Sequence, residues 1–431
     1  MSVWCERVID ASGVRDGVRY RLDARGAVTA VEIGVEPRGS DLVLGTALPG
    51  SANAHSHAFH RVLRGRTHAD GGDFWQWRDK MYAAAAALTP ERYQALARAV
   101  FAEMLVTGYT AVGEFHYVHH RPDGEPYPFA MEDALISAAE SVGIRLTLLD
   151  AAYLAGGVAR PLGPQQRRFG DGDARGYLDR WNALARRHRG VGAALHSVRA
   201  VPPEAIVEIA GELPPDVPLH IHLSEQPQEN ADSLAAYGAS PTQILFDAGV
   251  LDERMSVVHA THLTDEDIAL LGAAEVTVVM CPTTEADLGD GIGPAHRLAA
   301  DGARIALGSD QNAVVDPFLE MRGLEMQERL RSGLRGRFSP ADVLSASTVN
   351  GYRSLGHRIG PLNVGGPCDL VEVRTSSVRT VGARPDQLVF VATGTDVARV
   401  VVGGRVVADT GKLTSGEDPA EIMAEALAAL Q

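Results

Sequence analysis

Lysine is almost absent from this chain of 431 residues. Lys80 and Lys412 are the only lysines among the 40 basic side chains, and the other 38 are arginines. A metal bridge built from a carboxylated lysine can therefore use only these two positions.

Cysteine and long apolar runs are also scarce. Cys5, Cys281 and Cys368 lie far apart, which fits neither a disulfide framework nor a thiolate metal site. No stretch approaches the ~18 apolar residues that span a membrane. The segment Met1–Arg7 contains an acid and lacks the apolar core of a secretory signal. We therefore expect a cytoplasmic protein with no membrane partner.

Acidic side chains outnumber basic ones, 55 to 40. The formal net charge is -15, so a nucleic-acid partner, which needs a basic surface, is not expected. Apolar residues make up 45% of the chain and charged residues 22%, which is typical of a folded globular protein and excludes disorder. The length allows two to four domains of ~100–200 residues, or one large barrel with an attachment.

Both ends of the chain are rich in short strands. Residues 18–22 and 28–33 flank a turn, and residues 369–373 and 397–402 resemble them near the other end. A Gly403-Gly404 hairpin follows the last of these. We predict one small β-sandwich domain assembled from residues 1–45 and 361–431, the latter with a C-terminal helix.

The middle of the chain alternates between apolar β-type runs and helix-like segments. Helices are indicated at 90–105, 131–141 and 265–271, with Thr89 and Thr264 as N-caps. No G-x-G-x-x-G follows an early strand, which disfavours a dinucleotide-binding sheet. The pattern predicts a (β/α)8 TIM-like barrel over residues 46–360, within an α/β fold. Its eight strands are expected near 46–54, 109–115, 144–152, 191–198, 217–223, 255–260, 275–281 and 303–309.

Polar residues follow most of these strands, at the barrel end where active sites lie. His55 and His57 are two positions apart, so an extended strand would place both imidazoles on one side. The pair alone is weak evidence, because two histidines near a loop are common at surfaces. Together with His222 and Asp310 at other strand ends, it predicts a single divalent metal site, zinc above all, with room for a water molecule.

Two further residues at strand ends suit acid–base chemistry. Glu225 lies three residues after His222 and can carry a proton from the attacking water to the leaving group. His259 can polarise the substrate or hold the water. The alternatives are a solvated loop glutamate and a buried core histidine. No lysine lies at the end of the predicted fourth strand, so a lysine-bridged pair of metals is excluded and one metal is favoured.

These residues, in this order, resemble the amidohydrolase superfamily in its single-metal deaminase branch. Four local strings are similar to those of the formimidoylglutamate deiminases within it. They are Asn53-Ala54-His55-Ser56-His57-Ala58-Phe59, Phe74-Trp75-Gln76-Trp77-Arg78, Gly113-Glu114-Phe115-His116-Tyr117-Val118-His119-His120 and Leu195-His196-Ser197-Val198-Arg199.

This resemblance implies an activity and a set of roles. The reaction is hydrolysis of N-formimidoyl-L-glutamate to N-formyl-L-glutamate and ammonia in histidine degradation, by a homodimer with one Zn²⁺ per subunit. Metal ligands would be His55, His57, His222 and Asp310; catalytic residues Glu225, His259 and Asp310; substrate-binding residues His60, Arg78, Tyr117, His196 and Arg199. His60 departs from the glutamine usual in the family, which puts the exact substrate in question.

Two other functions compete with this prediction. One is a deaminase of the same superfamily acting on a purine, pterin or triazine-type heterocycle, which would need flat apolar walls in place of two arginines. The other is a non-catalytic barrel that binds or regulates, which would be expected to have lost some of the six metal and acid–base residues. All six positions are filled here, so we favour an enzyme with a small anionic substrate.

Overall fold

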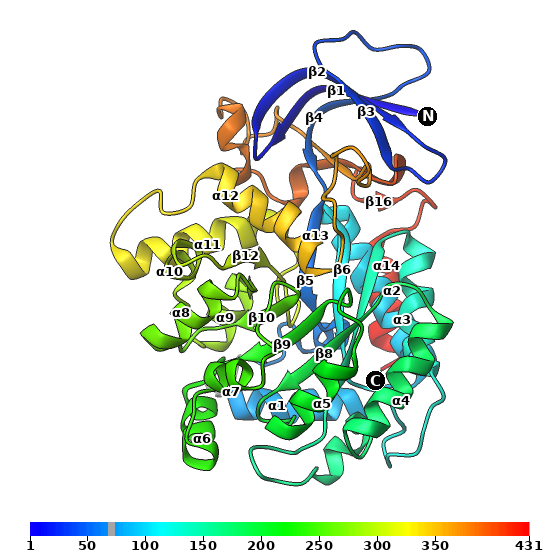
Figure 1. Ribbon diagram of the computed structural model, residues 1–431. Coiled ribbons are helices and arrows are strands. Elements are labelled where there is room, and N and C mark those ends of the chain that lie inside the picture. Colours follow the sequence, from blue (N-terminus) through cyan, green and yellow to red (C-terminus); the bar gives the residue numbers. More distant parts are fainter. Residues whose placement is uncertain (68–73, 431) are drawn as a thin grey trace.

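The computed structural model describes residues 1–67 and 74–430 and contains two large β-sheets. One is a parallel eight-stranded sheet in the sequential order β5 to β12, and the other combines strands from both ends of the chain. In Figure 1 the N-terminal strands, in blue, lie above the barrel, and α1 (Phe74–Ala86) lies at the opposite end. The predicted α/β barrel with a small β domain from both termini is confirmed.

The barrel strands follow the eight predicted runs closely. The first predicted run, 46–54, covers the end of β4 (Leu42–Pro49) and the start of the first barrel strand, because apolar residues continue from one strand into the next. Gly50 separates the two strands, and a Cβ there would lie 2.1 Å from Thr110 Oγ1, so only glycine fits the crossing. The barrel strands are β5 (Ser51–Ser56), β6 (Tyr109–His116), β7 (Arg145–Ala152), β8 (Val191–Ser197), β9 (Leu219–Leu223), β10 (Met255–His259), β11 (Thr277–Met280) and β12 (Arg304–Leu307).

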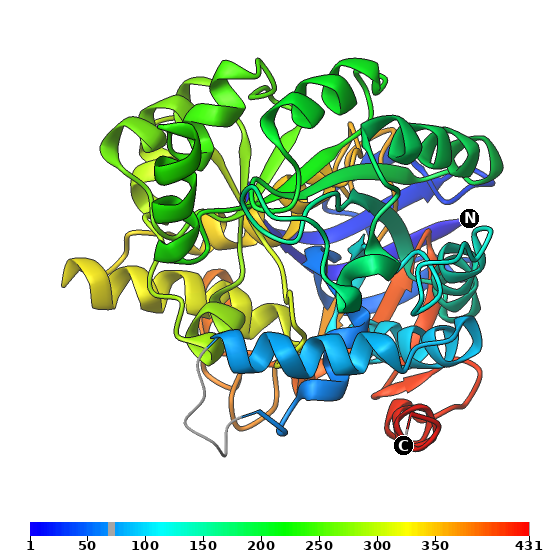
Figure 2. The same cartoon turned by 90° about the horizontal axis from the view of Figure 1, so that it is seen from below.

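Helices surround these strands, as the view along the barrel in Figure 2 shows. The predicted caps are present: the Thr89 hydroxyl accepts from Arg92 N, and Thr264 forms a reciprocal capping box with Asp267. After α1, the α-helices of the described residues are α2 (Pro90–Thr107), α3 (Ala130–Val142), α4 (Ala174–Arg187), α5 (Pro203–Glu212), α6 (Pro227–Tyr237), α7 (Pro241–Asp247), α8 (Asp265–Ala273), α9 (Pro282–Leu288), α10 (Ala295–Ala300), α11 (Pro317–Ser332), α12 (Pro340–Ser345), α13 (Gly351–Ser354) and α14 (Pro419–Ala428).

The terminal strands form one continuous mixed sheet. Its order is β16-β15-β14-β13-β4-β1-β2-β3, with β1 and β4 parallel and the other neighbours antiparallel. A separate apolar core lines it, including Val3, Cys5, Tyr20 and Cys368. The strands are β1 (Ser2–Asp10), β2 (Gly13–Leu22), β3 (Val28–Glu32), β13 (Leu370–Val373), β14 (Val397–Val402), β15 (Arg405–Asp409) and β16 (Lys412–Leu413).

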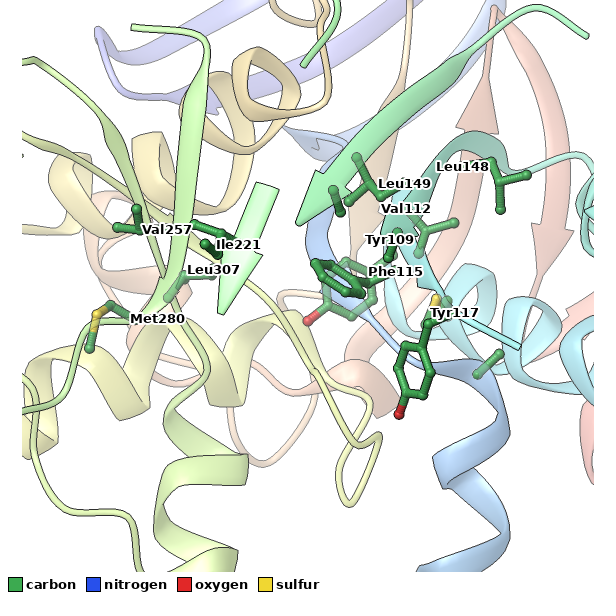
Figure 3. Packing of buried hydrophobic residues seen from close by; sticks show 14 of the residues in the cluster. Tyr109, Val112, Phe115, Tyr117, Leu148, Leu149, Ile221, Val257, Met280 and Leu307 are labelled. Atoms are coloured by element: carbon green, nitrogen blue, oxygen red, sulfur yellow. The ribbon is translucent and has the colours of Figure 1, made fainter. Parts of the chain in front are cut away.

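The main core lies between the barrel strands and their helices. Apolar side chains of successive strands, among them Val112, Leu149, Ile221 and Val257, are fully buried there (Figure 3). Burial of this kind is the principal stabilising contribution to such a fold. In the part of the chain that the structure describes, no helix is long and apolar enough to cross a membrane.

The barrel closes between its first and last strands. Ser56 and Asp310 form a parallel bridge, and the N–H groups of Ser309 and Asp310 both donate to His55 O, at 3.1 and 2.9 Å. A Cβ at Gly308 would lie 2.8 Å from the same carbonyl oxygen, so the absence of a side chain lets the strands approach. This closure brings three of the predicted site residues together, namely His55, His57 and Asp310.

Candidate active site

All six predicted metal and acid–base residues converge at one end of the barrel. His55, His222 and His259 are on β5, β9 and β10, whereas His57, Glu225 and Asp310 lie within three residues after the ends of β5, β9 and β12. All six are at most 6% exposed. His259 and Asp310 have φ angles of 71° and 44°, in the left-handed region that few non-glycine residues adopt. Backbone strain of this kind is typical of functional sites.

Four of these side chains have the spacing of a metal site. His222 Nε2 lies 3.1 Å from His55 Nε2 and 3.3 Å from His57 Nε2, and Asp310 Oδ1 lies 3.4 and 3.5 Å from the same two nitrogens of His55 and His57. Ligands of a tetrahedral zinc ion at ~2.0–2.1 Å are separated by about 3.3 Å. The four donor atoms therefore fit one tetrahedral ion.

The other ring nitrogens orient two of these imidazoles toward a cation. His57 Nδ1–H donates to Phe115 O at 2.8 Å, and His222 Nδ1–H donates to His196 O at 2.9 Å. The Nε2 atoms of His57 and His222 are then lone-pair donors, and burial holds the pKa of all three imidazoles below its ordinary value. Two lone pairs and a carboxylate that face one another, with a third neutral imidazole beside them, suit a bound metal ion.

A network of amides and a hydroxyl fixes the closing strands behind the metal ligands. The Asn53 side chain donates to Ser309 Oγ at 2.6 Å and accepts from Ser309 N at 2.9 Å. Asn312 donates to His57 O at 3.0 Å and accepts from Ser309 Oγ at 2.7 Å. Sequence analysis did not find Ser309 or Asn312, although both flank Asp310.

The two acid–base candidates, Glu225 and His259, lie beside the four side chains that we call the metal quartet (His55, His57, His222 and Asp310). His259 Nε2 is 3.8 Å from Glu225 Oε1 and 3.9 Å from Asp310 Oδ2, and its Nδ1 is 3.7 Å from Glu285 Oε1. Burial alone would lower the pKa of His259, but Glu225 and two further carboxylates raise it to about 10. These carboxylates favour the protonated form of His259, which can donate a hydrogen bond toward the metal site.

The five predicted substrate-binding residues line the same cavity as three of the four metal-quartet residues, His57, His222 and Asp310. Its volume is about 160 Å³, and it also contains Glu225 and His259. Sequence reasoning missed several residues of its wall, because they lie on α1 or on loops at positions that belong to no motif. The predicted members are His60, Arg78, Tyr117, His196 and Arg199; the missed ones include Tyr82, Tyr153 and Arg160.

Arg199 carries positive charge close to the acid. Its Nη2 lies 3.5 Å from Glu225 Oε2, and its Nε lies 3.7 Å from Glu229 Oε2. Burial alone would lower the pKa of Arg199, but Glu229 and Glu225 raise it. Glu229 also accepts from the backbone N–H of Glu225 at 3.3 Å, so it orients both residues.

Neutral aromatic and imidazole groups form the rest of the wall. His60 Nε2 lies 3.0 Å from the Tyr117 hydroxyl, within hydrogen-bonding distance. Burial holds the pKa of His60 and of His196 well below its ordinary range. His60 is therefore a neutral imidazole, able to donate or accept a hydrogen bond at the cavity wall.

A second buried cluster of histidines and acids lies outside this cavity. It contains His116 and His119, from one of the strings quoted above, together with Glu132 and Asp150. The guanidinium of Arg180 lies 2.8 Å from Asp150 Oδ1 and 3.4 Å from Glu132 Oε1. A fixed cation already compensates these carboxylates, which distinguishes this ion-pair network from the metal quartet.

Comparison with known proteins identifies the class. The model of the amidohydrolase family matches residues 46–407, so the chain belongs to this family, as predicted. It is 34% identical to formimidoylglutamate deiminase of Pseudomonas aeruginosa, over 100% of this chain and 99% of the relative, which confirms the predicted resemblance. The chain is accordingly a hydrolase of carbon–nitrogen bonds.

Solved structures agree with this assignment. An amidohydrolase from Brucella melitensis superposes with a TM-score of 0.92 at 31% identity, covering 100% of this chain and 99% of that one. An adenosine deaminase from Xanthomonas campestris with bound zinc superposes with a TM-score of 0.83 at 26% identity, covering 99% and 97%. Both support the barrel fold of this chain.

Proposed function

We propose that this protein hydrolyses N-formimidoyl-L-glutamate to N-formyl-L-glutamate and ammonia, as a step in histidine degradation. The observation that carries the proposal is a single cavity lined by three of the four metal-quartet residues, by Glu225 and His259, and by Arg78 and Arg199. The 34% identity to a formimidoylglutamate deiminase over the full chain supports it.

The metal in this proposal is one Zn²⁺ ion per subunit. The donor set of three imidazoles and one carboxylate suits zinc, and the 3.1–3.5 Å separations suit a tetrahedral ion. Zinc occurs in the structurally similar adenosine deaminase. When bound, such an ion lowers the pKa of a coordinated water molecule towards ~7 and polarises an electrophile.

Glu225 moves the proton in the proposed reaction. It accepts a proton from the attacking water, whose oxygen forms a bond to the formimidoyl carbon. His259 donates a hydrogen bond to the oxygen of the tetrahedral adduct, and Glu225 then protonates the terminal nitrogen, which leaves as ammonia when the carbon–nitrogen bond breaks. As the carbonyl of the product forms, the remaining O–H proton of the adduct passes to Asp310, whose Oδ2 faces His259.

Two arginines bind the acidic part of the substrate. Each guanidinium offers a planar fork that matches a carboxylate. In a protein of net charge -15, these local cations offset the general repulsion of a dicarboxylate. Tyr117, His196 and His60 complete the wall with hydrogen-bonding and aromatic groups.

The second candidate is deamination of a purine, pterin or triazine-type heterocycle. The likeness to the adenosine deaminase favours it, at 26% identity against 34% for the formimidoylglutamate deiminase. Charged guanidinium groups in the cavity disfavour it, because a neutral ring needs flat apolar surfaces. We further propose a homodimer, as the resemblance implies, and a cytoplasmic location, as the sequence features favour.

Ammonia release by the purified protein distinguishes the two functions. We expect turnover with N-formimidoyl-L-glutamate, weaker turnover with its aspartate homologue and none with guanine, adenosine or a triazine. Metal content is measured on the same sample, with an expected value of one zinc per chain. Turnover of a heterocycle in preference to the formimidoyl compounds contradicts the proposal.

A further inference from the structure

Gln166 lies behind the wall of the active-site cavity and holds two tyrosine hydroxyl groups. It is in η2 (Pro164–Phe169), and its Nε2 donates to Tyr153 Oη at 2.9 Å and to Tyr82 Oη at 3.1 Å. All three side chains are at most 7% exposed, and both tyrosines line the cavity.

The orientation of the Gln166 amide is fixed by the backbone. Gly163 N–H donates to Gln166 Oε1 at 2.9 Å, so the NH₂ group must face the tyrosines. Gly156 O, 3.4 Å from Nε2, is a further acceptor on that side. A Cβ at Gly156 would lie 2.7 Å from Gln166 Oε1, so a glycine there lets the loop enclose the amide.

This orientation decides where the tyrosine protons point. Because each hydroxyl oxygen already accepts from Gln166, each O–H must donate to something else. Even if one tyrosine donates to the other, one O–H is left to donate into the cavity. Burial also raises the pKa of the Tyr153 hydroxyl, so it stays protonated. The preferred partner of such a donor is an anion.

The surroundings of the two hydroxyls carry positive charge. The guanidinium carbon of Arg78 lies 5.7 Å from the centre of the Tyr82 ring, and the Arg199 charge acts on the Tyr153 hydroxyl. The His196 ring lies between Tyr153 and the metal quartet. The centre of the His196 ring is 4.4 Å from the centre of the Tyr153 ring and 5.0 Å from the centre of the His222 ring. The donors are therefore beyond the reacting centre.

We propose that Tyr82 and Tyr153, set by Gln166, bind the distal carboxylate of the substrate and select a dicarboxylate. In N-formimidoyl-L-glutamate this carboxylate is five bonds from the formimidoyl carbon, about 6 Å when extended. Arg199, 3.5 Å from Glu225, is then left for the nearer carboxylate. Gln166 is a positioning residue, since it acts through the tyrosines. This inference rests on the proposed function.

The test measures binding to the metal-loaded protein, without chemistry. The probes are N-formyl-L-glutamate and N-formyl-L-glutamine, which differ only in whether the distal group is a carboxylate or an amide. Calorimetry is expected to show that Tyr82→Phe and Tyr153→Phe each weaken N-formyl-L-glutamate binding about tenfold. Binding of the glutamine compound is expected to change less than about twofold.

Two more variants separate positioning from simple damage. Gln166→Glu is expected to draw both O–H groups away from the cavity and so to lower the preference for glutamate over glutamine by tenfold or more. Tyr177→Phe is the control, because it removes a buried tyrosine hydroxyl that donates to Asp150 O at 2.9 Å, away from the cavity. Its preference is expected to equal that of the wild type.

Three results overturn the inference. They are failure of the wild type to prefer N-formyl-L-glutamate, unchanged binding in either tyrosine variant, and equal weakening for both probes. Failure of the proposed function is seen separately, as absent ammonia release from N-formimidoyl-L-glutamate while the preference for the formyl dicarboxylate persists. Zinc content and thermal midpoint confirm that each variant is folded.

Discussion

Asp310 N–H donates a 2.9 Å hydrogen bond to His55 O across the line where the barrel closes. The two side chains of this pair also meet, with Asp310 Oδ1 3.4 Å from His55 Nε2. The same contact thus closes the barrel and forms one edge of the metal quartet. Changes that loosen this closure are therefore expected to reach the metal.

Asn53 tests this coupling. Asn53→Ala leaves Ser309 without both of its Asn53 hydrogen bonds, which lets Asp310 shift. We expect metal affinity to fall by about 10–100-fold, measured by competition with a chelator. Asn350→Ala is the matched control, because Asn350 donates to Ile305 O at 2.8 Å, elsewhere on the closing strand. Equal metal affinity in both variants would contradict the prediction.

Glu225→Gln tests the assigned proton carrier. The substitution keeps the size of the side chain but removes its basicity, so turnover is expected to fall by about 10²–10⁴-fold. Metal content should remain at the wild-type level, since Glu225 is not one of the four converging donors. Loss of the metal, or turnover close to that of the wild type, would refute the role.

Removal of the metal is expected to affect both activity and stability. Without a cation, the lone pairs of His55, His57 and His222 and the Asp310 carboxylate are left facing one another. A chelated sample should lose turnover and unfold at a lower temperature, because the metal binds the folded state selectively. Zinc should restore both. Full turnover in a sample shown to be metal-free would be incompatible with the proposed site.

Arg180 tests the second cluster. Arg180→Met leaves Glu132, Asp150 and Asp171 without their shared guanidinium, and we expect a loss of about 3–5 kcal/mol in the free energy of unfolding. Arg175→Met, on the same helix, breaks an ion pair whose side chains are 66% and 63% exposed, and should cost no more than about 0.5 kcal/mol. Urea unfolding measures both. Similar small losses would argue against a structural role for the cluster.

Glu114 should make stability depend on pH. Its carboxylate accepts from Ala58 N at 2.6 Å, and burial raises its pKa from 4.5 to about 8. Between these values the folded state binds the extra proton, so the free energy of unfolding falls as pH rises from about 5 to 8. Glu114→Gln should remove this component, and the difference between the two proteins should narrow at low pH. A difference that is constant with pH contradicts the assignment.

The barrel was predictable because its signals are local. Each strand is an apolar run bounded by turn residues, and caps such as Thr89 and Thr264 mark helix starts within a few residues. Only the start of β5 was misplaced, since the apolar residues of β4 run up to it. The candidate metal and acid–base residues were found for the same reason, because strand ends in a barrel share one face.

Other parts of the site have no local signal. Tyr82, Tyr153 and Gln166 lie on three different segments, and nothing in the sequence indicates that one amide holds two hydroxyls. The role of Glu229 is similarly invisible, since a glutamate near the start of a helix is common. Their arrangement depends on loop paths, which many long-range contacts set together.

By itself the sequence determined the fold class, the family and the residue types of a one-metal hydrolase. It did so through strand periodicity, the order of His and Asp at strand ends, and a scarcity of lysine that excluded a lysine bridge. Only the tertiary structure decided which metal-binding atoms face one another, which acids a guanidinium already neutralises, and which amide holds two tyrosine hydroxyls. These depend on distances of about 3 Å between segments far apart in the chain, because hydrogen bonds and metal bonds are short-range and directional.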